Sequence, residues 1–446
     1  MKLKITILLV VCATFITNAQ MKQWTLEECV LYAVENNLSV KQSELDLENA
    51  KIDKSDAIGN ILPNFNAQIS GSGNTGLSFD PTNNQPTTTT ILTSSGNATA
   101  AVNLFDGLRN YNRLNRAKMN ALASQYRLED LKDDIRLNVA NAYLSVLSNK
   151  EALKVSKAQY IVTEQDLNRT KELVESGVLP RGDLLEIEAT AATQEQQIVN
   201  NEALVLISRV SLAQLLQITD YENFDIANET FDVPPSDILD NSAKVIFDKA
   251  LTFRNDIKFS EMSVELAKKD VEINKGGYYP TLSAFFNYNT RYSDQFLDPI
   301  TGDLIGFKDQ LWINDGISYG AQLNIPIFNG WSTRNSVKRS QISLKQAELQ
   351  LEQDKLNLEA DIQQAYVNVN TFGKSYEAAG KTLESSRLAY EYSKERYDAG
   401  LLNAFDFGQA QARVDNAEAT LIRSKYDYIF RIKILEFFYG IPLSLD

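Results

Sequence analysis

The side chains that could do chemistry in this sequence are scattered and form no catalytic set. The 446 residues include no histidine and two cysteines, and one of these, Cys12, lies in an apolar N-terminal run. A nucleophile with its base, a phosphate-cradling glycine loop or a metal-ligand cluster would each need residue types and spacings that the sequence lacks. We therefore expect no enzyme, no cofactor and no bound metal. We interpret Cys29 as a small buried apolar residue.

Two carboxylates stand out because each begins a predicted helix. Asp183 is followed three residues later by Glu186, and Asp406 is followed by Gln409. An acidic residue with Glu or Gln three positions later is the pattern of a capping box, and a cap stabilises a helix by about 1 kcal/mol. The pattern predicts helices that run from residue 183 to about 216 and from 406 to about 438.

The N-terminus predicts export from the cytoplasm. Basic residues precede an apolar run at 5–16, and Thr17 and Ala19 then stand at the −3 and −1 positions of a cleavage site. Residues 1–19 are therefore predicted to be a secretory signal peptide. The mature chain keeps only Cys29, so an intrachain disulfide is impossible.

Charge and hydropathy limit the possible partners. The formal net charge of −14 argues against nucleic acid and anionic lipid, because both need basic patches. After the predicted signal peptide, no window offers the 18 uncharged apolar residues that a membrane-spanning helix would need. Any contact with a membrane must therefore be made by strands.

The strongest organising feature is an internal repeat. Ile61-Leu62-Pro63 returns 217 positions later as Tyr278-Tyr279-Pro280, and Phe105-Asp106-Gly107 returns 223 positions later as Phe328-Asn329-Gly330. The second offset then holds without a gap. Each half is predicted to contain strand, hairpin, strand, long helix, turn and helix, and a duplicated unit of this shape indicates pseudo-symmetric assembly.

The repeat sets the predicted domain boundaries. They are a first repeat at 20–218, an acidic linker at 219–241 that wraps around the outside, and a second repeat at 242–446. In the first repeat, Thr25 and Glu28 form a capping box that opens a short helix. A second helix is predicted from about 38 to 59, and residues 250–276 are predicted to match it.

Four segments alternate apolar and polar residues with a period of two, as half-buried strands do. Their apolar faces comprise Phe65, Ala67 and Ile69; Ala98, Ala100, Val102 and Leu104; Leu282, Ala284, Phe286 and Tyr288; and Ile317, Tyr319, Ala321, Leu323 and Ile325. Strands of about ten residues with one apolar face fit a membrane barrel, but four are too few to close one. Several chains would have to share the barrel. For the strands alone, a sheet packed on a soluble core is the alternative.

The helices that follow the strands are predicted to be very long. Residues 108–176 contain neither proline nor glycine, and about 70 residues in one helix would extend roughly 105 Å. Apolar residues recur every seven positions from Leu114 to Ala142, and again from Val139 to Val174 in a phase shifted by four. Such a shift locally unwinds a coiled coil. The second half repeats both phases. Small or polar residues beside the apolar seam, namely Ser156, Thr163 and Thr170, predict wide solvent-exposed surfaces.

Taken together, these features resemble the TolC-like outer-membrane efflux proteins over essentially the whole mature chain. The resemblance is carried by the duplicated Phe-(Asp/Asn)-Gly where a strand enters a long helix, and by the two helix turns at Glu175-Ser176-Gly177-Val178-Leu179 and Arg396-Tyr397-Asp398-Ala399-Gly400-Leu401. It implies an α+β membrane protein in which a long α-helical coiled-coil barrel continues a β-barrel. Each protomer of a homotrimer would contribute four of the twelve strands.

The resemblance also implies a location, partners and a function. The protein would lie in the outer membrane of a Gram-negative bacterium, in contact with its lipid, and extend into the periplasm. It would be the exit duct of a tripartite efflux or secretion system, fed by an inner-membrane pump through a periplasmic adaptor. The sequence names neither the cargo nor the class of pump.

By the same resemblance, the two turns would meet the adaptor and enclose an aperture. The implied docking residues are Gly177, Val178, Leu179, Gly400, Leu401 and Leu402, and the implied gate or aperture residues are Tyr397, Asp406 and Asp183. A ring of carboxylates at a narrow opening would favour cations. Leu402 stands where some members carry a gate arginine, and Gln409 where some carry a second acid. Tyr397 also completes the seven-residue seam, so packing and gating both remain open.

A secreted coiled-coil scaffold or adhesin without a pore is the alternative from another class. Helix pairs joined by sharp turns are also used as scaffolds. A trimer that requires detergent would favour the channel, whereas a protein that is soluble after removal of the leader would favour the scaffold.

Overall fold

The computed structural model describes residues 22–79, 86–227 and 231–442. The predicted signal peptide lies outside these residues. The chain divides into two compact units. The helical unit comprises Met1–Leu45, Tyr126–Lys258 and Gln353–Asp446, and the sheet unit comprises Asp46–Gln125 and Phe259–Glu352.

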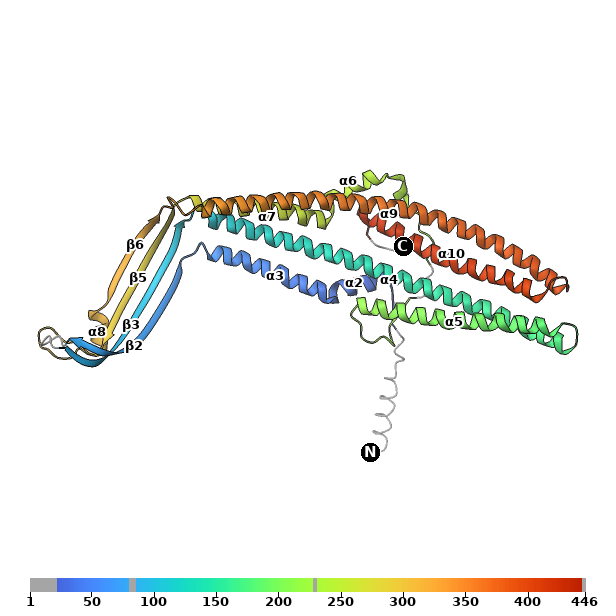
Figure 1. The fold of residues 1–446 in the computed structure, drawn as a ribbon, viewed down its shortest axis with the longest axis horizontal. Helices are drawn as coiled ribbons and strands as arrows, with labels where there is room; N and C mark the ends of the chain where they lie inside the picture. The colour runs from blue at the N-terminus through green and yellow to red at the C-terminus, as the bar shows by residue number, and fades with distance from the viewer. Residues whose placement is uncertain (1–21, 80–85, 228–230, 443–446) are drawn as a thin grey trace, which may run out of the picture. The chain divides into compact units, whose positions relative to one another are not determined.

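The sheet unit contains four antiparallel strands in the order β2 (Asn64–Phe79), β3 (Pro86–Phe105), β5 (Thr281–Ser293) and β6 (Gly316–Asn324) (Figure 1). Residues directly opposite one another in such a sheet share a face. One row across the sheet is Phe65, Ala100, Phe286 and Tyr319, and the adjacent row is Asn66, Thr99, Asn287 and Ser318. The register therefore keeps the predicted apolar residues on one face and the polar residues on the other.

The predicted strand length of about ten residues is wrong for the first hairpin, where β2 has 16 residues and β3 has 20. The added segments are rich in Ser and Thr, whose hydroxyls pair across the strands. Ser72 Oγ lies 2.9 Å from Thr93 Oγ1, and Thr75 Oγ1 lies 2.8 Å from Thr90 Oγ1. These cross-strand hydrogen bonds let a polar segment continue the sheet.

A short helix in the second hairpin was not predicted. The helix α8 (Phe307–Ile313) follows the turn after β5 and is held by Gln310, which is fully buried. The Gln310 amide nitrogen donates to the carbonyl oxygens of Ser293 and Ile305, at 2.8 and 2.7 Å. Its side-chain oxygen accepts from the Ser293 N–H at 2.8 Å. One buried amide thus holds the connection between β5 and β6.

The two long helices are continuous. The helices α4 (Arg109–Glu175) and α9 (Ser332–Asp398) have 67 residues each, and they are followed by α5 (Arg181–Leu215) and α10 (Ala404–Tyr439). In the described part of the chain, no helix combines the length and apolar character that a membrane crossing requires.

The short helices also repeat. The helices α2 (Leu26–Asn36) and α3 (Leu38–Gly59) return as α6 (Ala243–Phe253) and α7 (Asn255–Lys275). The predicted capping box of α2 is present, because Thr25 Oγ1 accepts from the Glu28 N–H and the Glu28 carboxylate accepts from the Thr25 N–H. The prediction that residues 250–276 match the helix at 38–59 is wrong at its N-terminal end, because α7 begins at Asn255. Two helices meet at Arg254, because its backbone is not helical.

The core of the helical unit joins both repeats to the segment between them. Cys29, Val139, Leu212 and Ile429 are fully buried in one cluster. Cys29 is a buried apolar residue, and its burial raises the pKa of the thiol to about 12. An unreactive thiol is consistent with this position.

The predicted acidic linker at 219–241 does not simply wrap around the outside. Residues Phe224 and Ile226 are buried at 2% and 0% exposure, and β4 (Asp225–Ile226) pairs in parallel with β1 (Gln23–Trp24). The Asp225 carboxylate binds Lys150 Nζ at 2.7 Å. Buried apolar side chains and ion pairs to the helices therefore anchor the segment.

Candidate functional site at the hairpin turns

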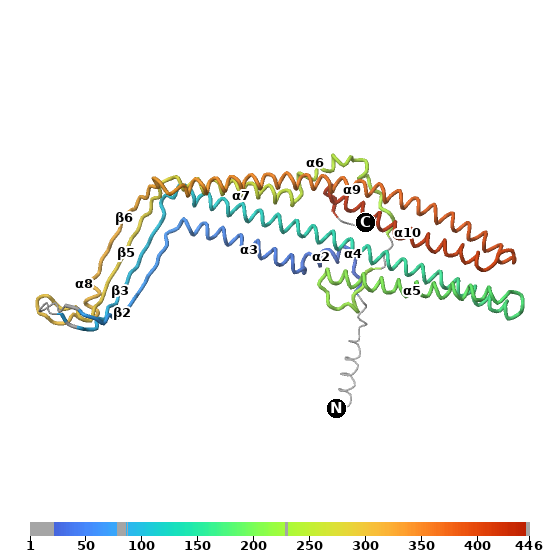
Figure 2. Tube along the Cα trace, viewed as in Figure 1, coloured from blue at the N-terminus to red at the C-terminus, as the bar shows by residue number. Residues whose placement is uncertain are grey.

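Both helical hairpins turn with the same backbone geometry. Gly177 and Gly400 have φ values of +76° and +71°, which glycine adopts without steric cost. The N–H groups of Gly177 and Val178 donate to the carbonyls of Val174 and Leu173, and those of Gly400 and Leu401 donate to Tyr397 and Arg396. This is the Schellman motif at a helix C-terminus. Figure 2 shows the chain reversing after α4 and after α9.

The turns present apolar side chains to solvent. Val178 is 67% exposed and Leu401 is 72% exposed, whereas Leu179 and Leu402 are half-buried. A Cβ added at Gly177 or Gly400 would meet no atom within 4 Å. The six predicted docking residues thus form two similar surfaces, each with an open glycine beside an exposed apolar side chain.

The predicted capping role of Asp183 is wrong. The helix α5 begins at Arg181, with Pro180 at the N-cap and no side-chain cap. Asp183 is the third helical residue, and its N–H donates to the Pro180 carbonyl at 3.1 Å. Proline fixes its own φ near the extended N-cap geometry and offers no side-chain acceptor. Its carboxylate in the first turn instead interacts favourably with the positive end of the helix dipole.

The predicted cap of α10 is also displaced by three residues. Asn403 is the N-cap, and its Oδ1 accepts from the Asp406 N–H at 2.8 Å. Asp406 Oδ2 accepts from Asn403 Nδ2 at 3.1 Å. The cap is therefore Asn403, and Asp406 bonds to the side chain of that cap instead of capping the helix itself. An asparagine followed three residues later by an acid was the sequence signal that we missed.

Tyr397 packs inside the second turn. Its ring stacks on Phe407 with centroids 4.7 Å apart and planes 6° from parallel, and Tyr390 stacks on the same Phe407 at 5.5 Å. Phe407 is 3% exposed. Burial raises the pKa of Tyr390 to about 12. The three rings form the seam between α9 and α10, as the seven-residue spacing predicts for Tyr397.

Two contacts join this turn to the first hairpin. The Tyr397 hydroxyl lies 3.5 Å from Thr170 Oγ1, and the Arg169 guanidinium donates to the Asp398 carboxylate at 2.8 Å. Asp406 is exposed and Asp183 is half-buried. The structure thus places Tyr397 at a link between the hairpins and both acids at the first turns of the returning helices.

The expectation of wet surfaces beside the seam is wrong for two threonines. Thr163 and Thr170 are 0% and 2% exposed. Gln411 Nε2 donates to Thr163 Oγ1 at 2.6 Å, so the polar groups are satisfied across the hairpins. The first seven-residue phase does not stop at Ala142. It continues through these residues as a buried polar stripe. Buried polar atoms need hydrogen-bond partners, and the facing hairpin supplies one here.

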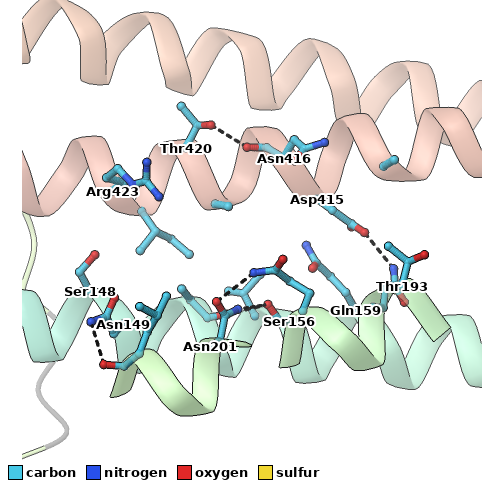
Figure 3. Close-up of a pocket in the computed structure, with 18 residues that line it drawn as sticks. Ser148, Asn149, Ser156, Gln159, Thr193, Asn201, Asp415, Asn416, Thr420 and Arg423 are labelled. Atoms are coloured by element: carbon cyan, nitrogen blue, oxygen red, sulfur yellow. Dashed lines mark hydrogen bonds between the residues drawn. The ribbon is translucent and has the colours of Figure 1, made fainter. Parts of the chain in front are cut away.

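A polar cavity of about 500 Å³ lies beside this stripe. It is lined by Ser156 and Gln159 of α4, Thr193 and Asn201 of α5, and Asp415, Asn416 and Thr420 of α10, among others (Figure 3). Asn201 Nδ2 donates to Ser156 Oγ, and Gln194 Nε2 donates to the Asp415 carboxylate, both at 2.8 Å. This cavity was not predicted from the sequence. The seven-residue spacing from Gln194 to Asn201 was the available signal.

Burial dominates the electrostatics of Asp415. Desolvation raises the pKa of this carboxyl from 3.8 to about 6, and the nearby Glu418 adds a smaller upward contribution. The hydrogen bond from Gln194 opposes the shift. Over the described residues, no three His, Cys, Asp or Glu side chains are placed to hold a metal ion.

Comparison with known proteins gives a consistent result. Residues 32–216 and 246–431 match the family described as outer membrane efflux protein. The chain is 22% identical over 306 residues to the outer membrane protein TolC of Vibrio cholerae, an alignment that covers 66% of this chain and 65% of TolC. The match therefore spans slightly less than two thirds of that relative.

Solved structures share the fold. The chain superposes on CusC with a TM-score of 0.79 at 16% identity, over 96% of both chains. It superposes on the CmeC outer membrane channel of Campylobacter jejuni with a TM-score of 0.80 at 19% identity, over 93% of this chain and 85% of that one. At these identities the likeness concerns the fold.

Proposed function

This chain belongs to the outer membrane efflux protein family, and we propose that it is the outer-membrane exit duct of a tripartite efflux or secretion system. Its membership confirms the predicted family and the predicted fold of long helices with four antiparallel strands. The predicted location, an outer membrane with an extension into the periplasm, is that of the family. The alternative of a secreted scaffold or adhesin falls with this assignment.

The observation that carries the proposal is the construction of the sheet. Its apolar face leaves Phe65, Ile69 and Tyr319 exposed at 72%, 86% and 80%. Within the described sheet, β2 and β6 are each paired along one edge only. Strands in hydrocarbon need partners on both edges, so four strands from each of three copies would close a barrel of twelve.

The experiment combines mass with conductance. Detergent-solubilised protein measured by light scattering should have the mass of three protomers, and the same preparation should conduct ions in planar bilayers. Heat-dissociated protein is the control for conductance by detergent. A folded monomer in detergent, or a trimer that never conducts, would contradict the proposed duct.

The proposed partners are a periplasmic adaptor and, through it, an inner-membrane pump. The two Schellman turns support a docking role, because each leaves an apolar side chain, Val178 or Leu401, exposed to solvent. The docking surface would comprise Gly177, Val178, Leu179, Gly400, Leu401 and Leu402. Asp406, Asp183 and Tyr397 would line or close the aperture beside it.

A further inference from the structure

The strands of the sheet unit carry a single charged side chain. Aspartate, glutamate and lysine are absent from β2, β3, β5 and β6 over their described bounds, and Arg291 of β5 is the one arginine in them. Arg291 is exposed. Its side chain forms no ion pair and no hydrogen bond with other described residues. The described part of the chain therefore gives this charge no partner.

The strand register places Arg291 on the polar face of the sheet. Ser95 lies directly opposite it on β3, and Ser70 of β2 lies opposite Ser95. The two serine hydroxyl oxygens are 2.8 Å apart. Two residues along the same face, Asn97 lies opposite Asn289. The neighbours of the arginine on this face are thus hydroxyls and amides, which carry no charge.

The acidic residues that follow β5 in the chain bind the backbone instead. Asp294 Oδ1 accepts the Leu92 N–H at 2.9 Å. Asp298 Oδ1 accepts two backbone N–H groups of its own turn, at 2.8 and 3.2 Å. These bonds hold the connection after β5, and neither carboxylate forms an ion pair with Arg291.

The position of Arg291 along β5 places it near one boundary of the apolar band. It follows Thr281, the first residue of β5, by ten positions. At about 3.4 Å per residue and a tilt of about 45°, ten residues rise roughly 24 Å, close to the height of the apolar band of a membrane barrel. The next residue, Tyr292, belongs to the opposite face and packs edge to face on Phe307, with centroids 5.0 Å apart. Aromatic residues form such girdles at membrane interfaces. A charge on the polar face at this level would lie in the water inside a barrel.

We propose that Arg291 sets the ion selectivity of the strand section of the duct. The three copies of Arg291 in the proposed trimer form a ring of guanidinium groups inside the barrel. This ring binds anionic groups, carboxylate or phosphate, on the solutes that pass. The proposal rests on the proposed duct and deepens it, because it assigns a class of ligand to one residue of the wall.

Two properties of the site favour an anion. Arginine stays charged in proteins, and its planar guanidinium can donate two parallel hydrogen bonds to a carboxylate or a phosphate. Rings of basic side chains accordingly line pores for anions. In addition, the uncharged hydroxyls and amides of the described polar face do not cancel the field of such a ring.

Thiol reactivity measures the field beside Arg291. In a chain carrying Cys29→Ala, Asn289→Cys places a thiol on the polar face two residues from the arginine. Trimers in lipid vesicles are treated with thiosulfonate reagents that are anionic, cationic or neutral, and the neutral reagent reports any change of access. Arg291→Gln should lower the ratio of the anionic to the cationic rate by roughly tenfold, because charged clefts concentrate counter-ions to at least this extent. Arg291→Lys should retain the ratio.

Two controls test charge and orientation. Lys308→Gln removes an equal charge from an exposed residue of α8, outside the strands, and should leave the ratio unchanged. Tyr288→Cys places the thiol on the apolar face. It should react with neither charged reagent, because lipid covers that face.

Block of the ionic current gives a second readout. Tripolyphosphate and citrate should reduce the wild-type current in planar bilayers, and Arg291→Gln should weaken the block. A larger change for tripolyphosphate assigns phosphate as the preferred group, and a larger change for citrate assigns carboxylate. Lys308→Gln should block as wild type does.

The outcomes separate this inference from the proposed function. A rate ratio, or a block by both anions, that Arg291→Gln leaves unchanged would overturn the role of Arg291 and leave the duct standing. Reaction of Tyr288→Cys with protection of Asn289→Cys would reverse the two faces of the sheet and overturn the proposed barrel as well.

Discussion

Asp406 occupies the third position of α10, and this position separates its charge from the cap of its helix. The cap itself is Asn403, which accepts the Asp406 N–H at 2.8 Å. The carboxylate adds one hydrogen bond, from Asn403 Nδ2 at 3.1 Å. Because the side chain is exposed, its contribution to stability is small, and a role for its charge can be tested without unfolding the turn.

We predict that Asp406→Asn changes ion selectivity more than stability. The substitution keeps the backbone bond to Asn403 and removes one charge per protomer, with a loss of roughly 0.3–1 kcal/mol from the helix dipole. In planar bilayers it should reduce the preference for cations and weaken block by multivalent cations, because an acidic ring at an opening concentrates cations.

Asn403→Ala is the matched control for this prediction. It removes the cap, at a cost of about 1 kcal/mol, and keeps the Asp406 charge. It should therefore lower thermal stability without a change in selectivity. Unchanged selectivity and block in Asp406→Asn would leave the residue with a structural role only.

At the scale of elements, the two hairpins meet through buried polar side chains instead of a purely apolar seam. Thr163 and Gln411 bond to each other, and Gln194 bonds to Asp415. Buried polar contacts specify one alignment, because any slip leaves donors and acceptors unpaired. The same contacts make the packing sensitive to the ionisation of Asp415.

We predict that the stability of this packing falls as the pH rises from about 4 to 6. Burial raises the pKa of Asp415 from 3.8 to about 6, so in this range the folded chain holds a proton that the unfolded chain has lost. Above pH 6 the folded state carries the full cost of the buried charge, at most about 3 kcal/mol. Thermal unfolding of wild type and Asp415→Asn, measured from pH 4 to 8, gives the comparison.

The neutral variant should be more stable than wild type at pH 7, and the two should converge near pH 4. Thr193→Ala, which changes an exposed residue lining the same cavity, controls for altered packing and should show no such pH-dependent difference. An equal difference between wild type and Asp415→Asn at every pH would contradict a titrating Asp415.

Elements with strong periodicity were predicted well, and elements held by tertiary contacts were not. The seven-residue spacing and the absence of glycine and proline predicted α4, because a regular apolar seam needs no distant partner to be recognised. By contrast, α8 depends on one buried amide, Gln310, whose partners lie in β5 and the following turn. No local pattern around residues 307–313 reports those bonds.

The candidate site shows the same division. Glycine at 177 and 400 predicted the turns, because a positive φ is a local requirement. The caps at Pro180 and Asn403 were missed because the acidic residue at the third position of each helix was interpreted as the cap. The cavity beside Asp415 was missed because it forms only where three helices meet, and polar residues at seam spacing were interpreted as solvated surface.

At the scale of the whole molecule, duplication gives the chain two nearly equivalent turns. Gly177 and Gly400 have the same backbone hydrogen bonds, and each is followed by an exposed apolar residue. An adaptor that recognises one turn should therefore recognise the other. Three copies would present six similar surfaces. Leu179 and Leu402 are equivalent leucines, and the surfaces differ in the residues that flank them.

We predict that a bulky residue at either turn weakens adaptor docking. Gly177→Trp and Gly400→Trp place a large ring on the open side of the turn, where an added Cβ meets no atom of the chain within 4 Å. Each should reduce capture of the co-expressed adaptor, and the double variant should reduce it further.

Gly177→Asn and Gly400→Asn are the matched controls, because asparagine tolerates the left-handed backbone without adding bulk. Trimer yield, measured for all five variants, separates blocked docking from failed assembly. Wild-type capture by both tryptophan variants, in preparations with wild-type trimer yield, would mean that the turns only reverse the chain and that the adaptor binds elsewhere.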